Sequence, residues 1–169
     1  MRTKIFTLLS LTVLGAWLTS ANAQIEKNEA AYIFNFTRFI KWPDSQTTGD
    51  FVIGVLGKSQ AITNELKASA SSRSVGSQSV KIVEFASADM IQNCHILFVP
   101  DDYSSQLKKA HAKLVSSAAV IITEEDGWNP DESTINLMVV DQKLAFHINK
   151  ANADAKKLVI SEKLMTLSK

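Results

Sequence analysis

The chain has 169 residues, of which 46% are hydrophobic and 21% charged, with 18 lysines and arginines against 17 aspartates and glutamates. This length and composition are typical of one globular domain with enough chain for a core. The near-neutral charge argues against nucleic acid as a partner, because a nucleic-acid-binding domain favours a basic surface.

Residues 1–23 have the three parts of a secretory signal. Arg2 and Lys4 supply the positive start, Ile5–Leu18 is an apolar core, and Ala21-Asn22-Ala23 is a small-x-small cleavage site. The apolar run is shorter than the about 20 residues that span a bilayer. We therefore predict export, cleavage after Ala23 and a single domain over residues 24–169.

Residues 25–41 are predicted to form a helix, because Pro43 disfavours helical conformation in the residue before it. Five apolar residues share an arc of about 120°, which suits packing on a core: Tyr32, Ile33, Phe36, Phe39 and Ile40. Phe34, Arg38 and Trp42 lie on the other side. Either a neighbouring loop covers these three residues, or they form a contact surface for another chain.

Four apolar runs rich in valine and isoleucine follow, each typical of a strand buried on both faces: Phe51–Leu56, Val80–Phe85, Ile96–Val99 and Ala119–Thr123. The segments between them suit crossovers or, in the serine-rich case, a surface loop: Ser59–Ala70, Ser69–Ser79, Ala86–Asn93 and Ser104–Ser116. The repeated order predicts an α/β fold, with a mostly parallel sheet between helices on both faces. This is a Rossmann-like or flavodoxin-like three-layer sandwich.

The last third of the chain has a different pattern. Thr134–Val140 and Leu144–Ile148 are β-like runs close enough in sequence to form an antiparallel hairpin at one sheet edge. Asn149–Lys157 and Ser161–Leu167 are predicted helices, the second with Ser161 as its N-cap.

Gly57-Lys58-Ser59 has the form of the end of a nucleotide-binding loop. The motif G-x-x-x-x-G-K-[ST] needs a glycine where this chain has Val52, so a phosphate loop is excluded. A weaker candidate remains at the carboxyl ends of the strands, where free backbone N–H groups can hold an anion or small ligand. Its residues are Gly57, Lys58, Ser59 and Asp101.

Acidic residues gather at the same predicted edge, in Asp101-Asp102 and Glu124-Glu125-Asp126. Paired carboxylates can hold Mg²⁺ or Ca²⁺ or act as acid and base, but strand ends are also simply solvated. No EF-hand spacing is present, and we predict no metal site.

The histidines and the cysteine give no catalytic pattern. His95 and His147 lie in or beside strands without metal-ligand spacing, so we interpret them as ordinary hydrogen-bonded histidines. Cys94, the only cysteine, cannot form an intramolecular disulfide; burial is favoured over a bridge between chains. It precedes a strand and not a helix N-terminus, which disfavours a thiolate. We predict no enzyme, no catalytic residue and no cofactor.

Three segments taken in order resemble the YfiR family of exported bacterial proteins. They are Ala31–Pro43 (AYIFNFTRFIKWP), Asn93–Val99 (NCHILFV), and Phe146–Asn149 (FHIN) running into Ile160–Met165 (ISEKLM), with Phe51–Gly57 between the first two. The resemblance covers nearly the whole chain after the signal. It rests on the combined order, since no single segment is sufficient.

The resemblance implies a periplasmic, dimeric regulator without catalytic activity. The best-known members bind the periplasmic domain of YfiN, an inner-membrane diguanylate cyclase, and keep cyclic di-GMP and biofilm formation low. The outer-membrane lipoprotein YfiB sequesters such regulators. Redox control by an internal disulfide does not transfer to a chain with one cysteine. Where many members have a glycine pair, this chain has Asn129–Thr134, so a family function of that loop is not assumed.

On this basis we expect Phe34, Arg38 and Trp42 to belong to a receptor or homodimer surface, so that Phe34→Ala with Trp42→Ala weakens association and leaves the fold intact. Two other function classes stay open. One is a small-molecule sensor or carrier with its ligand near Lys58, Ser59 and Asp101, and the other is a periplasmic hydrolase that uses the carboxylates or Cys94.

Overall fold

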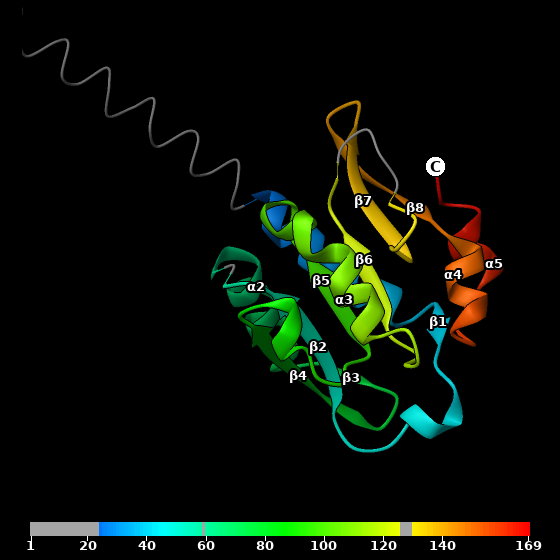
Figure 1. The fold of residues 1–169 in the computed structure, drawn as a ribbon. Coiled ribbons are helices and arrows are strands. Elements are labelled where there is room, and N and C mark those ends of the chain that lie inside the picture. The colour runs from blue at the N-terminus through cyan, green and yellow to red at the C-terminus, as the bar shows by residue number, and fades with distance from the viewer. Residues whose placement is uncertain (1–23, 59, 126–129) are drawn as a thin grey trace, which may run out of the picture.

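The computed structural model describes residues 24–58, 60–125 and 130–169. These residues form an α/β fold around a sheet with strand order β3-β4-β2-β5-β6-β7-β8 (Figure 1). The five strands from β4 to β7 in that order are parallel, and β3 and β8 pair antiparallel at the two edges. The predicted fold class is confirmed. The predicted export signal, Ser59, Asp126 and Asn129 lie outside the described residues.

The strands of this sheet are β2 (Phe51–Leu56), β3 (Ser74–Val75), β4 (Gln78–Phe85), β5 (Ile96–Val99), β6 (Val120–Thr123), β7 (Ile135–Val140) and β8 (Lys143–Ile148). A separate pair joins β1 (Ile40–Lys41) to β9 (Val159–Ile160). The α-helices are residues 24–36, α2 (Gln60–Ala70), α3 (Leu107–Lys113), α4 (Lys150–Ala155) and α5 (Glu162–Met165). Short 3₁₀ helices are η1 (Asp44–Gln46), η2 (Ala88–Met90) and η3 (Asp101–Gln106).

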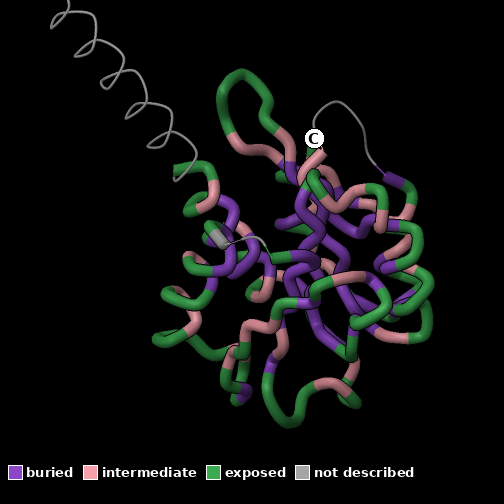
Figure 2. The backbone as a smooth tube through the Cα atoms, turned by 60° about the vertical axis from the view of Figure 1, so that its left-hand side comes forward, coloured by how far each residue is buried: buried purple, intermediate pink, exposed green. Residues whose placement is uncertain are grey.

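Alternate side chains of the central strands enter two separate cores, one on each face of the sheet. Ile53 and Val55 of β2 join the N-terminal helix, α2, α4 and α5 in the larger core. Leu56 of the same strand joins η2 and α3 in the smaller core. Figure 2 shows the buried backbone concentrated in the centre, with an exposed hairpin tip projecting from it. The structure therefore has three layers, as the buried strand pattern predicts.

The N-terminal helix ends earlier than expected. Residues 37–39 form a turn, in which the Thr37 hydroxyl donates to the carbonyl of Phe34 at 2.7 Å. A threonine hydroxyl that bonds a nearby carbonyl competes with the helical backbone pattern. The chain then extends, and Ile40 pairs with Ile160 across the small β1–β9 sheet.

Phe34 and Trp42 are core residues. Their exposed fractions are 2% and 5%. The Trp42 Nε1–H donates to the carbonyl of His95 at 3.3 Å, and its ring meets Phe51 edge-on at 4.9 Å between centroids. The Arg73 guanidinium lies 5.0 Å from the Phe34 ring centroid. The alternative in which the chain itself covers these aromatics is the observed one. This corrects the expectation that their replacement leaves the fold intact.

The interpretation of His95 and His147 as ordinary hydrogen-bonded residues is confirmed. His95 Nδ1 accepts the backbone N–H of Val52 at 3.0 Å, which leaves Nε2 to donate to the carbonyl of Gln46 at 2.9 Å. The ring stacks on Phe51 at 4.4 Å. His147 Nδ1 lies 2.9 Å from the carbonyl oxygen of Lys169. Burial lowers the pKa of His95, so the neutral ring is favoured.

The predicted crossover over residues 86–93 and the predicted antiparallel hairpin are both observed. Residues 86–93 contain only the short 3₁₀ helix η2, so the link from β4 to β5 is otherwise irregular. The β7–β8 hairpin turns through Asp141 and Gln142, both with positive φ (50° and 61°), which gives the strand twist of a type I′ turn. The predicted N-cap of the last helix is confirmed, because the Ser161 side chain accepts the backbone N–H of Leu164.

We predict that Trp42→Ala lowers the free energy of unfolding by about 3–5 kcal/mol, because it removes a buried aromatic that fills the space between β1 and β2. Urea denaturation followed by circular dichroism measures this change. Arg38→Ala, at an exposed residue nearby, is the control and changes stability by less than about 0.5 kcal/mol. Equal stability of the two variants would contradict the core assignment.

Candidate functional site

The carboxyl ends of the parallel strands hold the predicted anion site. The chain leaves β2 toward α2 on one face and β5 toward α3 on the other, so the crevice between β2 and β5 is the topological switch point of the sheet. Gly57 follows β2 with φ +85°, and η3 follows β5. A binding site in such a fold is expected at this position.

Tyr103 of η3 occupies this crevice. A Cβ atom on Gly57 would overlap the Tyr103 ring, and the positive φ of Gly57 also favours glycine at this position. The Tyr103 hydroxyl accepts the backbone N–H of Lys58 at 3.4 Å, and the N–H of Asp101 donates to Glu124 at 2.9 Å. Gly57, Lys58 and Asp101 thus meet at one edge as predicted, but the chain's own side chains already contact the N–H groups of Lys58 and Asp101.

A pair of hydrogen-bonded carboxyl groups, one buried and one partly buried, lies at the same end of the sheet. Glu29 of the N-terminal helix is 4% exposed and hydrogen-bonds through its side chain to Glu124, which follows β6. Burial, and then the nearby Glu124 charge, raise the pKa of Glu29 to about 9. Because the Asp101 N–H stabilises an ionised Glu124, we place the shared proton on Glu29.

The surrounding electrostatics do not favour an anion at this edge. Burial also raises the pKa values of Glu26, Glu124 and Glu125, and neighbouring carboxylates raise them further. Within the described residues, no group of three or more histidine, cysteine or acidic side chains is arranged to hold a metal ion. The carboxyl ends of the strands, which we call the carboxyl edge, therefore serve mainly as a contact between the N-terminal helix and the sheet.

We predict that Glu29→Gln reduces the pH dependence of stability. Folding raises the pKa of the Glu29 carboxyl group, so protonation of this group stabilises the folded protein. This stabilisation is lost as the pH rises from 4.5 toward about 9, and the wild-type protein becomes less stable over this interval. Glutamine keeps a hydrogen-bond donor to Glu124 without ionising. Melting temperatures measured between pH 5 and pH 9 should therefore converge at low pH and favour the variant at high pH.

The matched control for this measurement is Glu162→Gln, which changes an exposed glutamate in α5. If Glu29→Gln and wild type lose stability in parallel as the pH rises, the shared proton is not the cause.

A second candidate site is a groove of about 540 Å³ between the N-terminal helix, β8 and the residues around α5. Its lining is mainly aromatic and aliphatic, with several polar groups. The lining residues are Tyr32, Asn35, Phe36, Arg38, Phe39, Leu144, Ala145, Phe146, Leu164, Leu167 and Lys169. We call this surface the β8 groove.

The wall of the β8 groove is fixed by aromatic packing and by one hydrogen bond. The Phe36 and Phe146 rings meet edge-on at 5.1 Å, and Tyr32 meets Phe146 at 6.0 Å. The Tyr32 hydroxyl donates to the carbonyl of Leu144 at 3.0 Å. The helix is therefore held firmly against the edge strand, and the groove between them is preformed.

Two cationic side chains line the β8 groove. Arg38 and Lys169 line it, and among the described residues that line it none is acidic. Arg38 is exposed and Leu167 is 56% exposed, so a cation and an apolar side chain are both accessible. The arrangement suits a partner that offers an apolar side chain and a negative group.

Of the predicted surface residues, only Arg38 is exposed. Sequence reasoning placed Tyr32 and Phe39 on the core side and did not identify Leu144 and Leu167. The β8 groove depends on the antiparallel edge strand lying beside the N-terminal helix, and these segments are far apart in sequence. No pattern within a single segment of the sequence indicates that these segments are in contact.

A family model described as YfiR/HmsC-like matches residues 26–169, which is nearly the whole described chain. No curated protein matches this sequence. No helix in the described ranges has the length and hydrophobicity needed to cross a bilayer.

Proposed function

The chain belongs to the YfiR/HmsC-like family of regulators, and we propose that it is an exported, non-catalytic inhibitor of a membrane-bound signalling enzyme. The enzyme we propose is an inner-membrane diguanylate cyclase, whose periplasmic domain this protein binds. Inhibition in the periplasm would then lower cyclic di-GMP in the cell and limit biofilm formation.

The observation that carries this proposal is the β8 groove. It joins accessible apolar side chains to an exposed arginine on a preformed surface, which is the composition of a protein-binding hot spot. The carboxyl edge, where an α/β enzyme usually places its reactive groups, is instead filled by Tyr103 and a hydrogen-bonded carboxyl pair. Binding without catalysis accounts for both features.

Such an inhibitor needs no reactive group. It lowers the activity of its receptor if it binds the inactive conformation more tightly than the active one, and the shift cannot exceed that difference in affinity. An outer-membrane lipoprotein would release the receptor by competing for the same regulator. We also propose that the regulator acts as a homodimer, in keeping with the family resemblance.

We predict that Arg38→Glu weakens binding to the receptor by at least about tenfold, because a charge reversal next to apolar contacts opposes a negative partner group. Isothermal titration with the periplasmic domain of each membrane-bound diguanylate cyclase of the same organism measures the effect. Lys41→Glu reverses an exposed charge outside the β8 groove and is the control.

Unchanged affinity of a folded Arg38→Glu variant would remove the β8 groove from the interface. If wild-type protein binds none of these periplasmic domains, the receptor is not a cyclase, and co-purification from membranes then identifies another signalling protein.

The size of the β8 groove also favours a second candidate function, that of a small-molecule sensor or carrier. Its volume of about 540 Å³ lies within the range of about 300–1,000 Å³ typical of ligand pockets. A thermal-shift screen of amino acids and other metabolites tests it. A compound supports a ligand site if it raises the melting temperature of wild type but not of a Leu144→Trp variant, whose side chain fills the groove. If no compound does so, a protein partner alone is favoured.

A further inference from the structure

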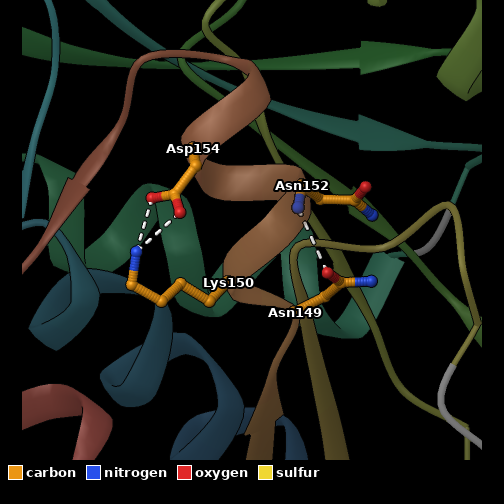
Figure 3. A network of polar contacts seen from close by, with 4 residues as sticks. All are labelled: Asn149, Lys150, Asn152 and Asp154. Carbon is orange, nitrogen blue, oxygen red and sulfur yellow. Dashed lines mark hydrogen bonds and ion pairs between the residues drawn. The ribbon is translucent and has the colours of Figure 1, made fainter.

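Lys156 occupies an unusual position at the end of α4. Asn149 is the N-cap of helix α4, and its side chain accepts the backbone N–H of Asn152 at 3.1 Å (Figure 3). Lys156 is the C-cap; Lys157 follows with φ 57°, and the N–H of Leu158 donates to the carbonyl of Ala153. Both ends of the helix are therefore fixed, and so is the backbone that carries Lys156.

The side chain of Lys156 is 8% exposed, and its ammonium group donates to the carbonyl of Ala119 at 3.0 Å. An ammonium group has three donors, so this contact uses one. Within the described part of the chain, no carboxylate oxygen lies within 4.0 Å of its Nζ atom. Lys150 of the same helix is different, because it is exposed and pairs with Asp154 at 2.6 Å (Figure 3).

A buried ammonium group without a counter-ion is energetically unfavourable. The titratable groups near Lys156 do not supply a counter-ion. Cys94 is a buried thiol whose pKa is raised to about 12 by desolvation, and it is therefore neutral. His111 adds no negative charge, and its pKa is lowered first by burial and then by Lys156 itself. Glu132 raises the pKa of His111, but none of its carboxylate oxygens lies within 4.0 Å of the Lys156 Nζ atom.

A second unsatisfied group lies in the same place. The Ser117 hydroxyl, in the connection between α3 and β6, is buried and has no hydrogen-bond partner among the described residues. Ser117 and Lys156 both line a groove of about 370 Å³, which we call the amino-edge groove because it lies where β6 begins. Its other lining residues are Pro43, Ser45, Gln46, Val115, Ser116, Ala118, Ala155 and Lys157.

We propose that the amino-edge groove binds a small ligand through an oxyanion group, a carboxylate or a phosphate. The oxyanion accepts hydrogen bonds from the Lys156 ammonium and the Ser117 hydroxyl, while the nearby Lys157 adds positive charge. One ligand group thus supplies both the missing counter-ion and the missing hydroxyl partner. The groove volume fits a metabolite, and among the described lining residues no carboxylate competes for the cations.

This site is distinct from the β8 groove, with which it shares no lining residue. It also lies at the opposite end of the sheet from the anion site that the sequence predicts near Gly57. Its existence does not depend on the identity of the receptor, and the two proposals can fail separately.

The test uses the mature protein labelled with ¹⁵N and titrated with sodium phosphate or sodium acetate, at constant ionic strength maintained with sodium chloride. We expect saturable shifts of the backbone resonances of Ser116–Ala118 and Lys156–Lys157, with a dissociation constant on the order of 1 mM for at least one anion. The phosphate and acetate arms distinguish a phosphate ligand from a carboxylate ligand.

Two variants assign the contacts. Lys156→Met keeps the buried stem and removes the charge, so it should weaken binding by at least about tenfold. Ser117→Ala, at a residue that is only partly buried, should weaken binding by about three- to tenfold. Lys143→Met, at the exposed first residue of β8, is the control and should bind as wild type does.

Shifts that are linear in concentration, or that survive both variants, would overturn the proposal, since they indicate nonspecific anion effects. The absence of any shift in these segments with either anion would overturn it as well. If Lys156→Met does not fold, the wild-type titration and Ser117→Ala still decide the question.

Discussion

The constraint on which the structure depends is the burial of β2, β5 and β6 on both faces. Val55 and Leu56, neighbours in one strand, enter separate cores on opposite sides of the sheet. Both faces must then be covered by helices, as in other parallel sheets. The positions that remain for polar side chains are the two ends of the strands and the sheet edges. The charged features of the molecule lie at these positions.

The two ends of the sheet differ in charge. At the carboxyl end, Glu29 hydrogen-bonds to Glu124, burial raises the pKa values of both, and Tyr103 lies in the crevice between β2 and β5. At the amino end, Lys156 is buried without a carboxylate partner among the described residues, and burial lowers its pKa. An α/β protein usually binds its ligand at the carboxyl end. Here the carboxyl end of the sheet favours a protonated carboxyl group, and the amino end is better suited to an anion.

The sequence predicts the interior strands well and the long-range contacts poorly. Phe51–Leu56 and Ile96–Val99 match the observed strands residue for residue, because continuous apolar runs report burial on both faces directly. The β1–β9 pair was missed because each strand has two residues and its partner is distant in sequence. Apolar periodicity carries no information about such a pairing.

The assignment of Trp42 was wrong for a related reason. A helical projection through residue 41 places Trp42 on the face of Phe34 and Arg38, but the helix ends at residue 36. The extended chain then turns Trp42 toward Phe51 and His95. Lys156 shows the same limit, because a lysine near a helix end is ordinarily solvated and only the tertiary structure reveals its burial.

The edge strand β8 constrains how a partner can bind. An open edge strand offers backbone groups on which another chain can add a strand. Here the carbonyls of Leu144 and Phe146 accept from the Tyr32 hydroxyl and the Lys169 N–H, and the N–H of Ile148 donates to the Ser168 hydroxyl. Strand addition would have to break these contacts. A partner of the kind we propose for the β8 groove would therefore be recognised through side chains, with Arg38 and the apolar residues beside it providing the contact.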